Sequence, residues 1–550
     1  MSSYLTPDVY TEEVPLLPPS VAEVSTAVPA FIGFTEKAVL EGKSVANQAV
    51  RISTLLEYKE IFGEAQPASF SVAINAEDAV TNIMVESPES TLYHALDLYF
   101  KNGGGDCYII SVGTYADNYN KGAFLTGLEI LSREDEPTLI MLGEATKLLS
   151  ADYHEVCQAA LLQCEDLKDR FCVFDIQKAD THAEAFRNGI GTNNLKYGAA
   201  YTPYLQTSLS YNYIDEEVNI LGSSSIKSLQ YELSGLIKVT YSGPASDNPR
   251  FKITRGDAEE TPSFSISQGL LTITNVGADG KLVSEVIAAW ETANGGARFD
   301  NQGFNIESLN DAGQVKSTGN TTHDLVLVSA DTKTLASIKD TKSALYSKIV
   351  SELAKERIVL PPSAAVAGVY ATTDRERGVW KAPANVSLSA VISPTVKITA
   401  ADQERLNVDA NAGKSVNAIR SFVGKGTLIW GARTLAGNDN EWRYVPVRRL
   451  FNMIEESTKK ASYFAVFESN DAATWLKVKA MIESFLYGVW QQGGLVGSTE
   501  EQAYFVNVGL GKTMTQQDIL EGRMIVEMGL AAARPAEFII LKFSHKLQEA

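Results

Sequence analysis

The first 35 residues contain five prolines, and these restrict the possible folds of the chain more than any other feature. They are Pro7, Pro15, Pro18, Pro19 and Pro29. A long helix is excluded here, because proline lacks a backbone N–H and disfavours helix at the preceding residue. Between the prolines, the run Val9–Val14 is predicted to form a short strand. A lone terminal strand cannot satisfy its own backbone groups, so it must join a sheet of its own subunit or of another.

The other end of the chain offers a second segment of this kind. The run Phe538–Ser544 is apolar on both faces and is predicted to be a strand. In a monomer such an edge promotes aggregation, whereas in a polymer it can pair with a neighbour through main-chain hydrogen bonds. Both termini are therefore predicted to exchange strands between subunits. The predicted exchange residues are Val9, Tyr10, Thr11, Glu12, Glu13, Val14, Phe538, Ile539, Ile540, Leu541, Lys542 and Phe543.

Residues 91–205 are predicted to form a parallel sheet covered by helices. Three short apolar runs without alternation are typical of strands that are buried on both faces. These runs are Tyr108–Val112, Thr138–Leu142 and Phe171–Ile176. Helical patterns alternate with them, near residues 92–101, 123–131 and 151–167. This order of strands and helices is a βαβ pattern, which favours a parallel sheet.

The rest of the chain differs in character. Residues 206–325 are rich in Ser, Thr, Asn, Asp and Gly, and their short alternating runs favour an inserted β-rich domain on the surface. Those runs are Leu236–Tyr241, Phe251–Thr254 and Leu270–Thr274. Towards the end, helices are predicted near 447–461 and over 472–490, and a strand over 523–531. The sequence therefore predicts an α/β and α+β multidomain fold.

Length and charge both indicate several domains with different surroundings. A chain of 550 residues is too long for one core, and domain sizes suggest roughly three or four domains. The net charge of −19 argues against a main role in holding nucleic acid or an anionic membrane. Residues 365–550 carry 21 basic and 19 acidic side chains, whereas residues 1–364 carry 27 and 48. Either one part faces partners and the other faces solvent, or two soluble domains differ by chance.

Targeting signals and cysteines favour a cytosolic origin. The first basic residue is Lys37, so a signal-peptide start is not expected. The apolar run over 525–541 is broken by Glu527, Arg534 and Glu537, and no uninterrupted run of about 18 apolar residues occurs. Four cysteines in 550 residues cannot form a disulfide scaffold. We therefore expect a chain that is made and folded in a reducing cytosol.

Two groups of residues are similar to binding motifs but fit them poorly. Gly511-Lys512-Thr513 is similar to a phosphate loop, yet such a loop needs a glycine where Val506 stands. The basic pairs Arg448-Arg449 and Lys459-Lys460 lie on amphipathic helices with acids nearby, and a solvated or protein-facing surface is expected for them.

Catalytic and metal-binding patterns are also weak. His154, Cys157, Cys164 and Cys172 are zinc-ligand types, but their spacing matches no standard zinc pairing, so core packing is the better interpretation. The α/β region has no Gly-x-Ser-x-Gly elbow and no Gly-rich phosphate turn after its predicted strands. No enzyme activity, metal or cofactor is therefore expected.

Several segments of the chain match the motifs of one family. The opening Thr6–Val14 is similar to a Pro-Gly-Val-Tyr-x-Glu-Glu start, with Asp8 in place of the usual glycine. The other matching segments are 28–35, 359–363, 368–370, 374–375, 378–385, 430–435, 442–449 and 519–543. With them the chain resembles the sheath proteins of contractile phage tails and related injection systems. The resemblance is dense over 355–550, clear at 1–35, looser at 36–220 and absent at 221–325.

The resemblance implies a structural protein rather than an enzyme. Many copies would stack as rings or as a helix around an inner tube, and terminal strands of neighbours would complete a small sheet in each subunit. Contraction of this metastable sheath would drive the tube through a target envelope. The implied partners are further copies of the chain, an inner tube protein, and baseplate and terminal cap proteins, without nucleic acid or direct membrane insertion. Assembly would take place in the bacterial cytoplasm, before the subunit becomes part of a phage tail or of a released or anchored contractile particle.

The resemblance also implies a discontinuous order of domains. An inner α+β sheath core would comprise residues 1–35 plus 365–550. A middle α/β domain would comprise 36–205 plus 326–364, and an outer β-rich insertion would comprise 206–325. The near-neutral charge of the proposed core and the acidic exterior agree with this order.

Two interpretations stay open at this point. Gln516, Gln517, Asp518 and Glu521 are candidate contacts to the tube, although the segment 515–521 fits an ordinary connecting helix equally well. An alternative of another class is an α/β ligand-binding protein or enzyme. It would use the crevice near Gly113 and Gly143, at the C-terminal ends of the predicted strands. A non-contractile shell protein that polymerises by strand exchange is a third hypothesis.

Overall fold

The computed structural model describes most of the chain between residues 21 and 540. The described ranges are 21–75, 78–221, 228–241, 248–256, 260–267, 269–274, 276–277, 279–294, 301–319, 321–328, 333–409 and 413–540. The chain divides into two compact units, each built from separate stretches of sequence. Unit 1 comprises Met1–Ala65, Ser90–Leu209 and Val359–Ala550, and unit 2 comprises Gln66–Glu89 and Ser210–Ile358.

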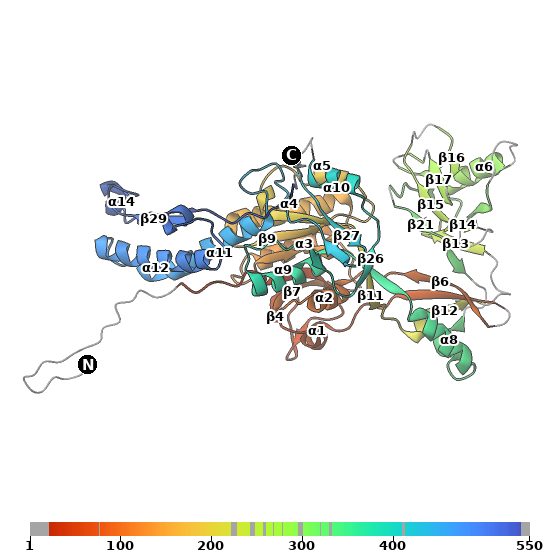
Figure 1. Cartoon of the computed structure of the whole chain (residues 1–550). Helices are drawn as coiled ribbons and strands as arrows, with labels where there is room; N and C mark the ends of the chain where they lie inside the picture. Colours follow the sequence, from red (N-terminus) through yellow and green to blue (C-terminus); the bar gives the residue numbers. More distant parts are fainter. Residues whose placement is uncertain are drawn as a thin grey trace, which may run out of the picture. The chain divides into compact units, whose positions relative to one another are not determined.

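A nine-stranded sheet forms the centre of unit 1 (Figure 1), in the order β25-β28-β27-β10-β9-β8-β1-β7-β4. Its strands are β1 (Pro29–Thr35), β4 (Ala49–Ile52), β7 (Cys107–Thr114), β8 (Leu139–Met141), β9 (Phe171–Asp175), β10 (Gly198–Thr202), β25 (Val386–Ser387), β27 (Asn417–Phe422) and β28 (Gly426–Ile429). The strands from β27 to β7 run parallel, and β25, β28 and β4 are antiparallel to their neighbours. Three of the parallel strands are those expected from the apolar runs, so the prediction of a parallel sheet is confirmed.

Helices cover both faces of this sheet. They include α2 (Leu92–Lys101), α3 (Lys121–Leu131), α4 (Ser150–Leu167) and α9 (Ser363–Arg377). Successive residues of a strand point to opposite faces, and β1 uses both. The ring of Phe31 packs edge-on against Tyr99 of α2, with ring centroids 5.4 Å apart. The neighbouring Ile32 contacts α3, where a Cβ on Gly127 would lie 2.4 Å from its side chain, so α3 can lie this close to the sheet only with glycine there.

The four cysteines belong to the core of unit 1. Cys107, Cys157, Cys164 and Cys172 are all buried and free. The Sγ atoms of Cys164 and Cys172 lie 3.4 Å apart, among the apolar side chains between α4 and β9. The prediction that His154 and the cysteines near it reflect core packing is confirmed for the cysteines, and His154 is buried as well.

The central sheet joins segments that the sequence assigned to different domains. Strands β1 and β27 come from the proposed inner core, and β7 to β10 come from the proposed middle domain. The two compact units are therefore defined by contacts within the chain, and they do not correspond to the three proposed domains. The three-part division by position in a sheath stays a prediction.

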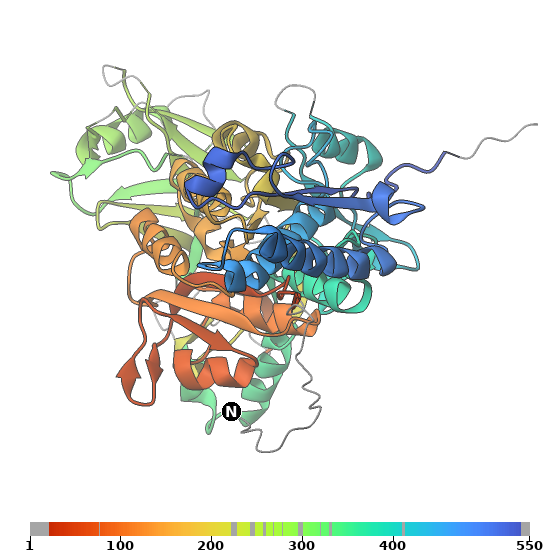
Figure 2. The same ribbon diagram turned by 90° about the vertical axis from the view of Figure 1, so that its left-hand side faces the viewer.

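Two long helices and a hairpin follow in the C-terminal part of unit 1. The helices are α11 (Val445–Ala461) and α12 (Ala472–Gln491), and the hairpin joins β29 (Tyr504–Val508) and β30 (Val526–Leu530). Shorter helices in this part of the chain are α10 (Ala400–Asn407), α13 (Glu500–Ala503) and α14 (Gln516–Leu520). Asp471 begins α12 by accepting the N–H groups of Ala473 and Thr474. The predicted helix over 472–490 is confirmed as α12, and its Val478, Ile482 and Val489 are buried in one cluster with residues of β29. Figure 2 shows α12 beside the hairpin.

Unit 2 contains the predicted β-rich insertion. One of its sheets has the order β23-β12-β5-β6, with β5 (Ser69–Ile74), β6 (Val80–Glu86), β12 (Val218–Leu221) and β23 (Lys333–Thr334), and packs on α7 (Leu335–Ile338) and α8 (Ser343–Leu353). Two further sheets have the orders β19-β14-β13-β22 and β16-β17-β15-β21. Their strands are β13 (Ser228–Leu233), β14 (Ile237–Tyr241), β15 (Arg250–Ile253), β16 (Ser263–Ser267), β17 (Leu270–Thr274), β19 (Phe304–Ser308), β21 (His323–Asp324) and β22 (Val326–Val328). The three predicted strands are β14, β15 and β17.

One helix in this insertion was not predicted. It is α6 (Val283–Asn294), whose Val283, Val286 and Trp290 are buried at helical spacing. The polar, strand-like composition around it conceals this signal in the sequence.

Two buried carboxylates hold helices α2 and α9 at the carboxyl edge of the parallel strands. Glu144, just after β8, accepts the N–H groups of Phe34, Thr91 and Leu92 and the hydroxyl of Ser90. Asp175, at the end of β9, accepts the N–H of Ser363 at 2.7 Å and bonds its hydroxyl at 2.5 Å. A carboxylate at a helix N-terminus is favoured by the unpaired N–H groups and by the helix dipole.

These carboxylates make stability depend on pH. Burial raises the pKa of Asp175 to about 7, although the bonds from Ser363 act in the opposite direction. The folded-state pKa lies above that of an unfolded Asp, so the folded state binds the proton more tightly. The stabilisation from the protonated form is complete at low pH and is lost as pH rises through about 7.

We therefore predict that Asp175→Asn flattens the pH dependence of unfolding. Asn keeps an acceptor for the Ser363 N–H and a donor for its hydroxyl, but it cannot ionise. In the wild type, the free energy of unfolding should fall by at most about 1.4 kcal/mol per pH unit from this group as pH rises from about 4 to 7. Chemical unfolding at a series of pH values measures this slope.

The control for this experiment is Asp402→Asn. Asp402 is exposed, and its bonds to the hydroxyl and N–H of Thr399 lower its pKa, so its contribution is lost as pH falls. An unchanged slope in Asp175→Asn would contradict the assignment.

Candidate functional site

The structure describes only part of one of the two predicted exchange strands. Val9–Val14 and Leu541, Lys542 and Phe543 lie outside the described residues. Phe538, Ile539 and Ile540 are described, and they belong to no strand of their own chain. Their side chains are 69%, 80% and 79% exposed. Three large apolar side chains in succession are thus left on the surface at the end of the folded body, where burial against a partner would be favourable.

The hairpin β29–β30 forms a sheet of only two strands in unit 1. Its register pairs Tyr504 with Leu530 and Val508 with Val526. Just beyond β30, the sole further pairing in the described residues is the bridge between Leu495 and Ala532. Most backbone groups along its outer edges therefore lack a strand partner within the described part of the chain, and such edges accept added strands.

The two faces of this hairpin differ. Tyr504, Val506 and Val508 are buried on the side of α12, whereas Phe505 is 48% exposed. Phe505 lies over its cross-strand partner Gly529, where an added Cβ would come within 2.1 Å of the ring. Gly529 therefore makes room for the ring, which covers the otherwise bare glycine backbone.

The four candidate tube contacts lie together on α14. This helix begins with a capping box, in which the Thr515 hydroxyl accepts the Asp518 N–H and Asp518 accepts the Thr515 N–H. Its hydrogen bonds from Thr515, ahead of those from Arg523, lower the pKa of Asp518. Glu521 accepts from Gln517 at 2.6 Å and pairs with Arg523 at 2.5 Å.

The local bonds explain three of these four residues. Gln517, Asp518 and Glu521 stabilise the short helix and its exit, whereas Gln516 is exposed and makes no side-chain bond within the described residues. The helix also exposes Leu520, by 77%, which residue-type reasoning missed because it looked for polar contacts. The Gly-Lys-Thr segment forms the turn before α14. The Thr513 hydroxyl donates to Ile525 O and accepts the Gly509 N–H at 3.2 Å.

One sequence expectation is wrong. Arg448 and Arg449 were expected on a solvated or protein-facing surface, but both are buried, at 2% and 3% exposure. Arg448 donates to Asn452 and Glu455, and its guanidinium lies 4.3 Å from the centre of the Trp442 ring. Arg449 pairs with buried Asp374. Local sequence could not show this, because the partners of Arg449 are on α9 and on the N-terminal segment.

The crevice of the alternative hypothesis is filled at one of its two positions. Around Gly143, an added Cβ would meet Asp175, Pro361 and Ser363 at 3.5 Å, so α9 and its capping carboxylate occupy this edge. Near Gly113 a cavity of about 760 Å³ remains, lined by residues that include Phe34, Lys37 and Asn118. Neither position has a glycine-rich phosphate turn.

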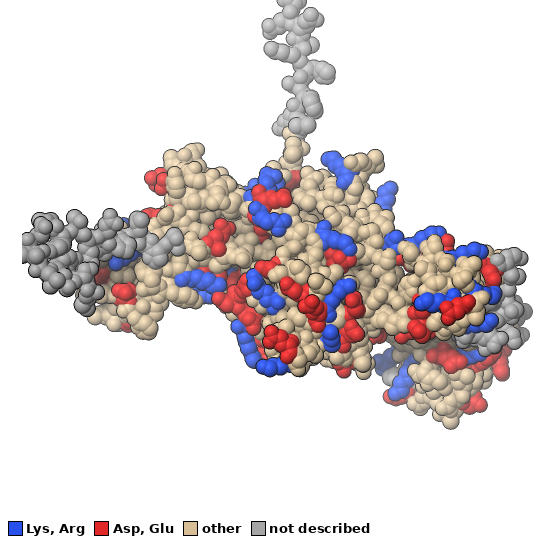
Figure 3. Space-filling model, turned by 90° about the horizontal axis from the view of Figure 1, so that it is seen from below, with Lys and Arg blue, Asp and Glu red and all other residues tan. Residues whose placement is uncertain are grey.

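The described residues contain neither a metal site nor a membrane span. They contain no cluster of three or more His, Cys, Asp or Glu side chains that could hold a metal ion. None of the helices in that part of the chain combines the length and the apolar composition needed to cross a bilayer. On the face in Figure 3, acidic and basic side chains are interspersed.

Comparison with known proteins gives matches for the C-terminal region and for the whole chain. The family model described as phage tail sheath C-terminal domain matches residues 437–546, which include α11, α12 and the β29–β30 hairpin. The tail sheath protein of Vibrio phage KVP40 is 25% identical over 185 residues, or 34% of this chain and 26% of that protein. The tail sheath protein of Enterobacteria phage T4 is 27% identical over 25% of this chain and 20% of that protein. The matched part thus spans about a quarter of the length of these curated relatives.

Solved structures match over nearly the full length. The sheath of an extracellular contractile injection system, PVC, in its contracted state is 27% identical, with a TM-score of 0.56 over 99% of both chains. The contracted helical sheath of the anti-feeding prophage is also 27% identical, with a TM-score of 0.58 over 99% of this chain and 100% of that one. Together with the family model, these matches show that the chain is similar to the sheath proteins of contractile phage tails and injection systems.

Proposed function

We propose that the chain is the structural subunit of a contractile sheath, which polymerises around an inner tube and contracts to drive that tube through a target envelope. The observation that carries this proposal is the full-length match to a contracted injection-system sheath, at 27% identity over 99% of both chains. A match that spans both compact units supports a shared task for the whole chain rather than for its C-terminal domain alone.

Strand exchange at the β29–β30 hairpin is the proposed joint between subunits. The hairpin offers open edges, and Phe538–Ile540 are exposed and unpaired in the described residues. Added strands from the N-terminal and C-terminal segments of neighbours would satisfy the backbone groups of both partners. Main-chain pairing of this kind can persist while the other contacts between subunits repack.

The proposed surroundings follow from this role. The core of residues 1–35 plus 365–550 would face the tube, 36–205 plus 326–364 would form the middle, and 206–325 would point outward. The partners would be further copies of the chain, an inner tube protein, and baseplate and terminal cap proteins. The subunit would assemble in the bacterial cytoplasm and act within a phage tail or a related particle, without enzyme activity.

Electron microscopy of the purified chain tests the function. Hollow cylinders that exist in two lengths and diameters are the expected result. A protein that stays monomeric at high concentration, with or without the inner tube protein, would contradict it.

We predict that proline in the C-terminal segment blocks the joint. Alternate N–H groups of a strand point to opposite sides, so Ile539→Pro and Ile540→Pro together remove one donor on each side. Neither residue contacts the described body as a strand, so thermal unfolding of the subunit should be unchanged. Sedimentation should show loss of polymer. The matched controls Ile539→Val and Ile540→Val keep the donors and should polymerise normally.

The opposite result would exclude this arm from the joint. Proline variants that polymerise to the same extent as the valine controls would show that residues 539 and 540 are not paired in the sheath.

We also predict that Gln516→Arg weakens binding to the inner tube. Gln516 is exposed on α14 and has no bond to a described residue, so the change leaves the capping box intact. Co-sedimentation with tube protein should fall severalfold, while self-association stays unchanged. Lys512→Arg is the control, since it changes an exposed side chain of the preceding turn without altering charge. Equal tube binding by both variants would leave α14 as an ordinary connecting helix.

A further inference from the structure

The C-terminal segment leaves the body of unit 1 at a buried arginine. Glu537 is the residue immediately before exposed Phe538, and its carboxylate bonds Arg433 Nε at 2.9 Å and Nη2 at 2.6 Å. Asn407 Nδ2 donates to the same carboxylate at 3.0 Å, and the Tyr444 hydroxyl donates at 3.3 Å. The Arg433 side chain is 5% exposed and that of Glu537 is 22% exposed. Bidentate pairing fixes both the position and the direction of the two groups.

Arg433 is itself held in place by the body. Its backbone N–H donates to Asn417 of β27, and its Nη1 donates to Asn407 O. Although burial alone would raise it, the bonds from Arg433 and Asn407 hold the pKa of Glu537 below its usual value. The carboxylate is thus charged near neutral pH.

The N-terminal segment is held by a second buried arginine. Arg449 Nη2 donates to Thr26 O at 2.8 Å, and the Thr26 hydroxyl donates to Asp374 at 2.6 Å. Arg449 and Asp374 are paired with each other at 2.5 Å, and both side chains are buried. Two neighbouring bonds continue this attachment, from Val24 N to the Ser457 hydroxyl and from Val28 N to the Thr138 hydroxyl.

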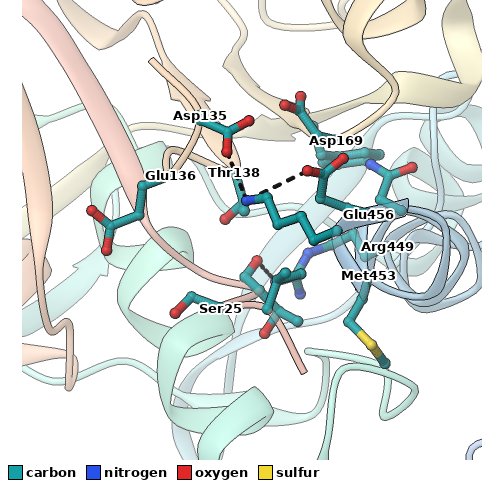
Figure 4. Close-up of a pocket in the computed structure, with 13 residues that line it drawn as sticks. Ser25, Asp135, Glu136, Thr138, Asp169, Arg449, Met453 and Glu456 are labelled. Atoms are coloured by element: carbon teal, nitrogen blue, oxygen red, sulfur yellow. Dashed lines mark hydrogen bonds and ion pairs between the residues drawn. The ribbon is translucent and has the colours of Figure 1, made fainter. Parts of the chain in front are cut away.

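A cavity lies beside this N-terminal attachment. Its volume is about 290 Å³, and its lining includes Val24, Ser25 and Thr26 on one side and Met453, Glu456 and Lys460 of α11 on another. Figure 4 shows Ser25 and Arg449 at its edge, with Glu456 and Asp135 around the Lys460 ammonium. Residues 24–26 are therefore held to the body by directed hydrogen bonds and by the packing of Val24 against the cluster that includes Met453.

We propose that Arg433 and Arg449 are the anchors of the two terminal arms. Arg433 binds Glu537 directly before the exposed residues 538–540, and Arg449 binds Thr26 between the packed Val24 and strand β1. Each arginine so fixes the path of its arm on the body and passes tension from the arm to the body. This inference rests on the proposed strand exchange for its purpose, but the anchoring itself is a property of the single subunit. The arginines act as positioning residues and make no contact with the neighbouring subunit in this scheme.

The first test measures arm motion in the isolated chain. The native cysteines are all buried, so a spin label at Ile540→Cys attaches selectively. Glu537→Gln should shorten the rotational correlation time of this label roughly twofold, because the charged bidentate bond is lost. The matched control Glu404→Gln, an exposed carboxylate on α10 without an ion pair in the described residues, should leave it unchanged. Thermal unfolding of Glu404→Gln should match that of the wild type, whereas Glu537→Gln should unfold at a lower temperature, because buried Arg433 loses its charged partner. The label is therefore measured well below both transitions.

A second variant keeps the test valid if Glu537→Gln does not fold. Glu537→Asp retains the charge but is one methylene too short for the bidentate geometry, so it should free the label partially. For the other arm, Thr26→Val with a label at Ala22→Cys should increase mobility, while Ser25→Ala should not. Unchanged label mobility in folded Glu537 and Thr26 variants would overturn the proposal.

The second test uses assembled cylinders. Cylinders of Glu537→Gln should form but break into shorter pieces on contraction, while those of Glu404→Gln stay whole. Breakage equal to the control would overturn the transmission of tension. If the wild-type chain forms no cylinders at all, the proposed function fails, and the label measurements on single subunits still decide whether the arginines anchor the arms.

Discussion

The position of β1 between β7 and β8 is the constraint on which unit 1 depends. All seven residues of this strand are buried, and it pairs in parallel with both neighbours. Its two faces carry α2 and α3, and Glu144 binds the N–H of Phe34 near its end. The N-terminal segment begins directly before it, at Val28. Because β1 is enclosed on every side, the point at which the N-terminal arm leaves the sheet is fixed by the same contacts that build the core.

The attachments of the arms follow from this arrangement. Thr26 lies only three residues before β1, where Arg449 of α11 and Asp374 of α9 converge on it. At the C-terminal arm, Glu537 forms a bidentate pair with Arg433, whose backbone N–H donates to Asn417 of β27. Removing one member of a buried ion pair leaves the other charge without a partner, which typically costs a few kcal/mol of stability. Substitution of either residue in each pair is therefore expected to destabilise the subunit. Each arm is thus held by an arginine–carboxylate pair, Arg433 with Glu537 and Arg449 with Asp374.

Local patterns were enough to predict elements whose partners are near in sequence or whose apolar runs are distinctive. Local sequence patterns predicted strands β7, β8 and β9, helix α12 and the β-rich insertion. Pairing between remote segments was not accessible, and β27 joins β10 across more than 200 residues. The burial of Arg449 has the same cause, since its carboxylate partner Asp374 is 75 residues away in the sequence. Arg448 pairs with Glu455 on its own helix, and its guanidinium also lies over the ring of Trp442. At the candidate site, Phe538–Ile540 are exposed and form no strand, so the exchange strand predicted there stays a prediction.

The interleaving of the two units has a consequence for synthesis of the chain. All of unit 2 lies between Gln66 and Ile358, so it can be complete while the ribosome is still adding the last third of the protein. The central sheet of unit 1 cannot be completed until β27 and β28 emerge, and the hairpin, α14 and the C-terminal anchor follow them. Of the surfaces proposed to join subunits, the hairpin and the C-terminal segment are therefore translated after unit 2. A nascent chain can fold unit 2 before the acceptor hairpin exists, which limits premature association on the ribosome.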